Sequence, residues 1–455
     1  MIYFILRFLF TFIKNCGIIY YVKGRKIRKC WKLARISVKK GELNGTVSMP
    51  PSKSAAHRAI ICAALSDGKS IISPVDMSND IVATINCMKA LGADIELEGN
   101  VLMVNGKNIF SNKDLGLDCG ESGSTLRFLV PVCCAGGITA EFTGHGKLPE
   151  RPIGIYLDCL PEKGIDCKTQ GGLPLKVSGK LESGLYRIAG NVSSQFITGL
   201  LLALPLLEGD SEIILTTELQ SSGYIDMTTD IMEQFGVEVK RTETGWKIKG
   251  GQKYTARDFT VEGDWSQAAF FMTAAAISGK VTIDNLNSES SQGDKECLEI
   301  YKRFGADVTE DDDKITVQRN KLKGIEINAE NIPDMVPALS VVGALAEGVT
   351  IIKGAGRLRI KECDRLAAMS DGLSRMGADI KETEDGFIIH GADCLKGAEV
   401  NGYNDHRIVM SLAAAAFGAD GEVIISDMES INKSYPKFFE DYRKVGGKAD
   451  VIMGE

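Results

Sequence analysis

Residues 88–97 read MKALGADIEL, a helical run that ends in glycine and passes into a β-type run. The same pattern returns as PEKGIDCK (161–168), MEQFGVEVK (232–240), YKRFGADVT (301–309), LSRMGADIK (373–381) and YRKVGGKADVI (442–452). Successive glycines of the six copies lie 69 or 72 residues apart. Glycine is preferred where a helix ends in a left-handed residue, and a Val- or Ile-rich run after it indicates a strand. The period predicts six structural units that together account for most of the chain.

A second marker keeps the same period. Strongly apolar helical segments, each followed by a glycine, are expected at 55–65, 126–135, 196–207, 268–277, 336–346 and 408–417. A helix that is apolar on nearly every face must be buried on all sides. Each unit is therefore predicted to contain a strand, a buried helix, a second strand, an amphipathic helix and further strands. We expect two similar α/β domains, each built from three units around its buried helices.

The boundary between the domains is expected after the third unit, near residues 255–262. A first strand at 36–49 precedes the first unit, so it is free to pair with the second half of the chain. This arrangement predicts two crossings between the domains, near Pro50–Pro51 and near Val261. The predicted domains are a discontinuous domain and a domain inserted into it: 33–50 plus 262–455, and 51–261.

Residues 1–32 form an apolar and basic N-terminal extension, in which Arg7 and Lys14 interrupt the apolar part. A secretory signal places its positive charge before the apolar run, and a membrane-spanning helix needs about 20 residues with few charges. Neither description fits. A mis-assigned translation start, a weak membrane-surface anchor and a disordered tail all stay open. We favour the first, in which these residues are not native.

Charge and cysteine content exclude several classes of protein. The net charge is −7, but residues 1–40 hold eleven Lys and Arg and no acid, which leaves −18 for residues 41–455. Such an acidic body repels nucleic acid, so no nucleic acid partner is expected, and anionic ligands must bind at local clusters of cations. The twelve cysteines contain no CxxC pair and the four histidines no HxxxH. We expect buried reduced thiols in a cytoplasmic protein, with neither a metal nor a cofactor.

Four segments combine a strand, a polar turn of small residues and the start of a buried helix. They are PPSKSAAHR (50–58), CGESGSTLR (119–127), GNVSSQF (190–196) and YNDHR (403–407). Helix N-termini present unpaired N–H groups and the positive end of the helix dipole, which favour phosphate or carboxylate. The cations and polar donors in these segments are Lys53, Ser54, Arg58, Ser124, Arg127, Ser193, Ser194, Gln195 and Arg407. One such segment alone is more often a simple capped helix, but four in one repeat frame predict a polyanion site.

Further cations lie on connecting segments: Arg151, Lys361, Arg365 and Lys433. Lys361 and Arg365 are four residues apart and would share one face of a helix if their segment is helical. Asp334 and Glu362 are the carboxylates we select for proton transfer. For either one alone, a structural ion pair is an equally weighted alternative. The chain has no GxxxxGK[ST] motif, and GESGS lacks the GxSxG spacing, so neither a P-loop protein nor a serine hydrolase is indicated.

These segments resemble the motifs of the 5-enolpyruvylshikimate-3-phosphate synthase family. In order, the matching motifs are KSAAHR, ERPIG, GNVSSQF, YIDMT, VEGD, IPDMVP, IKECDRL, YNDHRIVM and KSYPKFFED. The resemblance runs from Lys39 to Val445. It implies the enolpyruvyl transferase fold, two inside-out α/β domains of three βαβαββ units each. It also implies transfer of the enolpyruvyl group of phosphoenolpyruvate to the 5-hydroxyl of shikimate 3-phosphate, with release of phosphate, in chorismate and aromatic amino acid biosynthesis.

The resemblance implies roles for particular residues. A first set matches the shikimate-3-phosphate site: Lys53, Ser54, Arg58, Ser193, Ser194, Gln195, Ser221, Asp334 and Lys361. A second set matches the phosphoenolpyruvate site: Lys53, Gly123, Arg151, Gln195, Arg365, Arg407 and Lys433. Asp334 matches the proton acceptor for the attacking hydroxyl, Glu362 a carboxylate that protonates the enol methylene, and Lys53 a third catalytic residue. A monomer that acts on two small molecules, with no firm membrane partner, is expected.

Two positions depart from the family pattern. Many members have Gly-Asn-Ala-Gly-Thr where residues 120–124 read Gly-Glu-Ser-Gly-Ser, and an Asn where this chain has Arg357. We assign no role to Glu121 or Arg357. The small Gly123 is typical of relatives whose phosphoenolpyruvate pocket admits glyphosate, so sensitivity to that inhibitor is expected.

Two alternatives are weighed against this interpretation. The related transferase that acts on UDP-N-acetylglucosamine usually carries a reactive Cys or Asp on the loop before its Arg-Pro pair, and residues 144–149 contain neither. A catalytically silent anion-binding scaffold would lack Asp334, Glu362 or Lys53, and all three are present.

Overall fold

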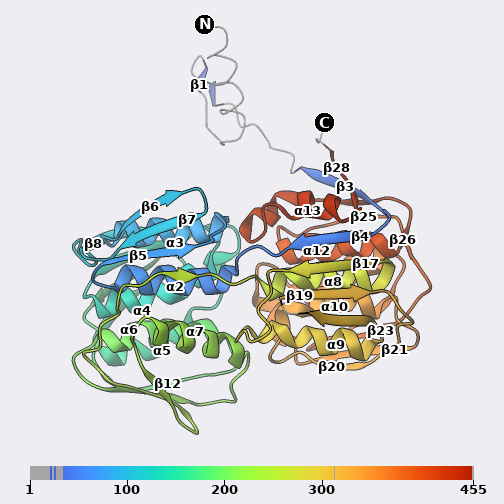
Figure 1. Ribbon diagram of the computed structural model, residues 1–455. Coiled ribbons are helices and arrows are strands. Elements are labelled where there is room, and N and C mark those ends of the chain that lie inside the picture. Colours follow the sequence, from blue (N-terminus) through green and yellow to red (C-terminus); the bar gives the residue numbers. More distant parts are fainter. Residues whose placement is uncertain (1–20, 23–24, 27–33, 312, 453–455) are drawn as a thin grey trace, which may run out of the picture.

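The computed structural model describes residues 21–22, 25–26, 34–311 and 313–452. They form two α/β halves that lie side by side (Figure 1). One hydrophobic core draws on residues 55–261, and the other on residues 36–49 and 265–449. The interpretations of the N-terminal extension fall outside the described residues, except at β1 (Tyr21–Val22) and β2 (Arg25–Lys26). Among the described helices, none is long and apolar enough to cross a membrane.

Six four-stranded sheets repeat one arrangement, in which a parallel pair is extended by two antiparallel strands. Across the sheets of the first half, the order is β16 (Phe259–Thr260), β5 (Lys69–Ser73), β7 (Val101–Asn105), β6 (Asp94–Glu98); β8 (Asp114–Asp118), β9 (Thr139–Thr143), β11 (Leu175–Gly179), β10 (Ile165–Lys168); and β12 (Gly184–Ile188), β13 (Ser211–Leu215), β15 (Gly245–Ile248), β14 (Val239–Arg241). A parallel pair cannot be joined by a tight turn, and a buried helix connects β8 to β9 and β12 to β13, whereas β5 and β16 lie at opposite ends of this half in the sequence.

The sheets of the second half follow the same arrangement. Their order is β4 (Asn44–Ser48), β17 (Lys280–Asp284), β19 (Lys314–Gln318), β18 (Asp307–Asp311); β20 (Glu326–Asn328), β21 (Val349–Lys353), β23 (Phe387–His390), β22 (Asp379–Glu382); and β25 (Glu399–Val400), β27 (Val423–Ile425), β3 (Arg35–Lys39), β28 (Lys448–Ile452). A short parallel pair, β24 (Leu395–Lys396) and β26 (Ala419–Asp420), lies beside them. The repeated arrangement confirms the predicted fold class.

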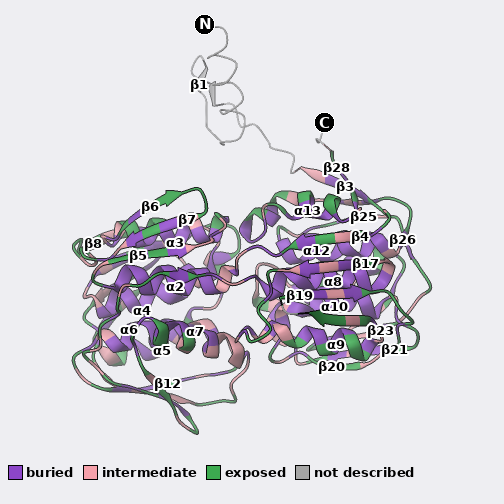
Figure 2. Ribbon diagram, in the orientation of Figure 1, coloured by how far each residue is buried: buried purple, intermediate pink, exposed green. Residues whose placement is uncertain are grey.

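Each half encloses three buried helices, which form the purple centres of the two halves in Figure 2. They are α2 (Lys53–Leu65), α4 (Gly123–Ala135), α6 (Ser194–Ala203), α8 (Trp265–Ser278), α10 (Val336–Gly343) and α12 (His406–Ala415). In α8 every residue except Ser278 is buried, and in α4 every residue except Ser124. Because these helices have no polar face, they are stable only inside a core.

A second set of helices is only partly buried and packs beside the buried helices: α3 (Asn79–Ala90), α5 (Gly154–Cys159), α7 (Ser222–Gln234), α9 (Cys297–Phe304), α11 (Arg365–Arg375) and α13 (Phe438–Lys444). The six repeat glycines all have positive φ, between 80° and 113°. The sequence prediction of a left-handed residue at these positions is therefore confirmed.

The prediction of one strand over residues 36–49 is wrong, because the segment forms two strands, β3 and β4, joined by residues 40–43. A side chain at Gly41 would overlap the carbonyl oxygen of Gly446, so this connection packs closely against the C-terminal segment. Both strands pair with strands of the second half. In return β16, which follows the third unit, pairs with β5 of the first.

The chain crosses between the halves twice, and the two crossings touch. Pro51 lies opposite Gly263. On either side of this pair, the amide of Ser52 donates to the carbonyl of Glu262 at 2.7 Å, and the amide of Asp264 donates to the carbonyl of Pro50 at 2.9 Å. The division into residues 33–50 plus 262–455 and residues 51–261 remains a proposal, which the two separate cores support.

Candidate functional site

A cleft lies between the two halves, at the N-terminal ends of buried helices. Serines cap three of these helices and Asp405 caps α12 by accepting from the Arg407 amide at 2.8 Å. Fourteen predicted site residues line the cleft: Lys53, Ser54, Arg58, Gly123, Arg151, Ser193, Ser194, Gln195, Ser221, Asp334, Lys361, Glu362, Arg365 and Arg407. The structure therefore brings together residues that are more than 300 positions apart in the sequence.

On the first-half side, Lys53 and Arg58 extend from the first two turns of α2. The Lys53 ammonium pairs with the Asp80 carboxylate at 2.7 Å, and its amide donates to Asp264 at 3.0 Å. The Arg58 guanidinium donates to Thr228 at 2.7 Å and stacks 5.1 Å above the ring of Phe128. These contacts fix both cations before any ligand arrives.

Arginine and amide donors follow along the same wall. Arg127 donates to the Gln195 side-chain oxygen at 2.6 Å, and the Gln195 amide donates to the Ser124 hydroxyl at 2.9 Å. Burial, followed by the nearby charge of Arg151, lowers the pKa of Arg127 to about 9. Arg127 donates to neutral oxygens and lies beside the charge of Arg151, so an anion between the two guanidiniums would be stabilised.

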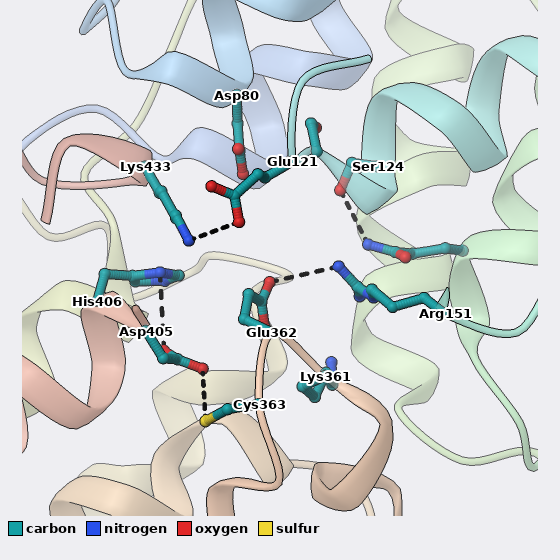
Figure 3. Close-up of polar contacts among 12 residues, drawn as sticks. Asp80, Glu121, Ser124, Arg151, Lys361, Glu362, Cys363, Asp405, His406 and Lys433 are labelled. Carbon is teal, nitrogen blue, oxygen red and sulfur yellow. Dashed lines mark hydrogen bonds and ion pairs between the residues drawn. The ribbon is translucent and has the colours of Figure 1, made fainter. Parts of the chain in front are cut away.

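On the second-half side, the Arg365 guanidinium contacts three carboxylates and is only 2% exposed. Its distances are 2.7 Å to Asp405, 2.9 Å to Asp334 and 2.7 Å to Glu362. Figure 3 shows Glu362 pointing across the cleft to Arg151, at 3.5 Å. Arg365 therefore holds both candidate proton-transfer groups in place.

Several cations surround the carboxylate of Asp334. Arg407 lies 3.3 Å and Lys361 3.5 Å from its carboxylate, and the Tyr224 hydroxyl lies 3.1 Å away. Burial alone would raise the pKa of Asp334, but Arg407, Lys361 and Arg365 hold it well below its usual range. The group is thus ionised and able to accept a proton.

Glu362 and Lys361 respond to the same surroundings in different ways. Burial would raise the pKa of Glu362, but Arg365 and Arg151 hold it well below its ordinary value. Burial lowers the pKa of Lys361 to about 8. An anionic ligand that takes over Arg151 would weaken one of the contacts that keep Glu362 ionised, which makes its protonation easier.

The expectation that Lys361 and Arg365 share one helix face is wrong. Asp364 caps α11 by accepting from the Ala367 amide at 3.0 Å, so the helix begins only at Arg365. Lys361 is extended, with φ −88° and ψ −150°. The two cations meet at Asp334 because the turn before α11 folds back.

Lys433 is the predicted site residue that does not line this cleft. It ends the short helix η8 (Met428–Lys433), and its ammonium contacts the Glu121 carboxylate at 2.9 Å and the Asn404 carbonyl at 2.6 Å. Its carbonyl accepts from Lys53 at 3.5 Å, so it lies directly beside the cleft.

Several functional neighbours were not selected from the sequence. Asp80 holds Lys53, and Asp405 holds Arg365; Arg357 donates to the Ser221 hydroxyl at 2.8 Å. Asp294 shares the Tyr224 hydroxyl with Asp334, and burial, followed by Asp334, raises the pKa of Asp294 to about 6. The preference of Asp for helix N-caps was a usable signal for Asp405, which directly precedes a predicted buried helix.

Comparisons with known proteins were made on the whole chain. The sequence model of a family described as EPSP synthase (3-phosphoshikimate 1-carboxyvinyltransferase) matches residues 38–442. Two proteins named 3-phosphoshikimate 1-carboxyvinyltransferase are similar to this chain. The one from Clostridium novyi is 48% identical over 429 residues, which cover 92% of this chain and 99% of that protein. The one from Clostridioides difficile is 46% identical over 431 residues, with the same coverage. A solved structure of EPSP synthase from Acinetobacter baumannii matches with a TM-score of 0.77 and 28% identity, over 92% of this chain and 100% of that one.

Proposed function

The chain belongs to the EPSP synthase family, and we propose that it transfers the enolpyruvyl group of phosphoenolpyruvate to the 5-hydroxyl of shikimate 3-phosphate, releasing phosphate in aromatic amino acid biosynthesis. The observation that carries the proposal is the two-sided cleft. One side offers buried cations, and the other offers two half-buried, ionised carboxylates held by Arg365. Both substrates are anions, and the reaction needs proton transfers between them.

In the first step, the 5-hydroxyl oxygen bonds to C2 of phosphoenolpyruvate while C3 gains a proton. Asp334 is the group that accepts the hydroxyl proton, because its cations keep it ionised. Glu362 is the group that delivers the proton to C3. It must first gain that proton, which the two anionic substrates favour by occupying Arg151 and its neighbours.

In the second step, Glu362, ionised after the first step, takes a proton from C3 while the bond from C2 to the phosphate oxygen breaks, so the double bond forms again and phosphate leaves. Lys53, Arg127 and Arg151 are placed to stabilise the charge on that phosphate. Their side of the cleft also excludes water, since Arg127 and Arg151 are both buried. In such surroundings a fixed cation stabilises an anion more strongly than in water.

The transferase that acts on UDP-N-acetylglucosamine is the alternative, and the names of the relatives do not favour it. The test is phosphate release by the purified protein with phosphoenolpyruvate and either acceptor. Release with shikimate 3-phosphate alone is expected, and its loss in Lys53→Met but not in Lys89→Met, an exposed lysine of α3, supports the assignment. Release with UDP-N-acetylglucosamine, or with neither acceptor, contradicts it.

A cytoplasmic location and a monomeric state are also proposed. Ten cysteines of the described residues are unpaired and seven of them are buried, which suits a reducing compartment. Size-exclusion chromatography with light scattering tests the oligomeric state, and a mass near twice 49.2 kDa would contradict a monomer.

A further inference from the structure

Glu121 joins the two halves at the edge of the cleft. It lies in the turn before α4, whereas its partners Lys433 and Asn404 belong to the second half. The Lys433 ammonium contacts its carboxylate at 2.9 Å, and the Asn404 side-chain amide donates to the same carboxylate at 3.2 Å (Figure 3 shows the ion pair). Only 7% of the Lys433 side chain and 18% of the Glu121 side chain are exposed, so water screens this pair less than a surface ion pair.

The surroundings fit this carboxylate closely. Gly146 has φ +59°, and a side chain there would overlap the Glu121 carboxylate. Tyr403 and Asn404 both have positive φ, 53° and 50°. That backbone conformation lets Asn404 use its carbonyl for the Lys433 ammonium at 2.6 Å and its side-chain amide for Glu121. Non-glycine residues with positive φ are uncommon, and here two consecutive ones position Asn404 against Glu121. We take this as a sign that the surrounding structure imposes the contact.

The contact lies directly beside the cleft. Lys433 touches Lys53 through its carbonyl, and Lys53 lines the cleft. In the free chain Glu121 neutralises the Lys433 ammonium, so that cation is already occupied. We propose that Glu121 is a positioning residue that acts through Lys433: its carboxylate holds the ammonium across the cleft until an anionic oxygen of phosphoenolpyruvate replaces it. This inference rests on the proposed function, because it names phosphoenolpyruvate as the incoming anion.

The replacement of Glu121 by phosphoenolpyruvate at the Lys433 ammonium has a direct kinetic consequence. Removing the Glu121 charge frees the ammonium and removes a competing anion, so phosphoenolpyruvate should bind more tightly. Shikimate 3-phosphate contacts other residues, and its KM should not move. A residue that served only to keep the loop folded would not lower one KM selectively.

The experiment compares Glu121→Gln with the wild-type chain in steady-state phosphate release. The glutamine keeps the size of the side chain and its contact to Asn404 but cannot form an ion pair. We expect the KM for phosphoenolpyruvate to fall about fivefold, the equivalent of losing one modest ion pair, with a smaller change in kcat. An unchanged or increased KM for phosphoenolpyruvate overturns the inference.

Two further variants sharpen the result. Glu121→Asp keeps the charge and should return the KM for phosphoenolpyruvate towards the wild-type value; a fall equal to that of the glutamine variant would show that charge is not the cause. Glu150→Gln removes a charge that pairs only with the exposed Lys147 among the described residues, and it should leave both KM values unchanged. If the glutamine variant does not fold, the smaller uncharged Glu121→Asn repeats the test. A wild-type chain without turnover would reject the proposed function, whereas an active wild type with an unmoved KM rejects only the role of Glu121.

Discussion

The two halves are built from the same unit, yet the ends of their buried helices carry different chemistry. In the first half, Arg127 donates to the neutral oxygens of Gln195 and Pro152. In the second half, Arg365 is surrounded by three carboxylates. The first half thus offers a buried guanidinium, Arg127, whose hydrogen-bond acceptors are neutral, and the second half offers carboxylates whose charge is held by cations. Anion binding and proton transfer are divided between two copies of one scaffold, so catalysis needs both halves in contact.

The largest expected effect comes from removing the central carboxylate of the second half. Asp334→Asn keeps the shape but cannot accept a proton, so kcat should fall about 10²- to 10⁴-fold, with a smaller change in the KM for phosphoenolpyruvate. Steady-state phosphate release measures both, and Asp311→Asn at the exposed end of β18 is the matched control. A fall in kcat of less than tenfold would contradict the proposed division of roles between the halves, because the proton-transfer group would then be another residue.

The next effect concerns stability. Asp405 is fully buried, pairs with Arg365 at 2.7 Å and caps α12. Asp405→Asn should lower the free energy of unfolding by about 3–5 kcal/mol, since a buried guanidinium loses its main partner. The first-half counterpart Ser193→Ala removes a neutral cap from α6 and should cost about 1 kcal/mol. Urea unfolding compares the two variants, and equal losses would contradict the difference between the halves.

A third effect is a pH dependence that the second half should show through Lys361. Burial lowers the pKa of Lys361 to about 8, so its ammonium is lost as pH rises through that value, and with it attraction for an anion. The kcat/KM for shikimate 3-phosphate should fall about tenfold per pH unit above pH 8. Arg127 also has a lowered pKa because it is buried beside Arg151, but a guanidinium keeps its charge in proteins, so the first half should add no decline of its own. Lys361→Arg should move the decline to higher pH, and an unmoved decline would assign it to another group.

The smallest expected effect concerns the close packing of Gly123 against two arginines of the first half. A Cβ at Gly123 would lie 2.8 Å from the Arg151 guanidinium and 3.0 Å from that of Arg127. Gly123→Ala should therefore displace an anion donor and raise the KM for phosphoenolpyruvate about fivefold, near the lower end of the cost of overpacking. Gly116→Ala, where a Cβ would meet nothing within 4 Å, is the matched control. Equal KM values in both variants would show that Arg151 does not need its present position.

Local features of the structure could be predicted from the sequence. The six repeat glycines and the polar turns before Lys53, Gly123, Ser194 and Arg407 each depend on a few consecutive residues. Capping and helix-dipole rules act over that range, so the sequence alone indicated side chains that line the cleft. The resemblance to the family added the identity of the two substrates.

Pairings between distant residues could not be predicted in this way. Arg365 and Asp405 are 40 residues apart, and Lys433 and Glu121 are 312 apart. No periodicity links such positions, because they meet only when separate units pack. Glu121 was visible as a departure from the family pattern, but its partner was not. The connection at Gly41, which splits the expected first strand, likewise depends on the distant Gly446.

The contact between Pro51 and Gly263 has a consequence for how the gene could be rearranged. The inserted half leaves and re-enters the other half at hydrogen-bonded neighbours, and β16 closes its first sheet from the far end of that segment. Its three units therefore form a ring with no structural beginning. Joining residues 51 and 261 by a short linker and opening the ring at the exposed hairpin of Gly99, where φ is +62° and nothing lies within 4 Å of a Cβ, would produce a circular permutant with every sheet intact.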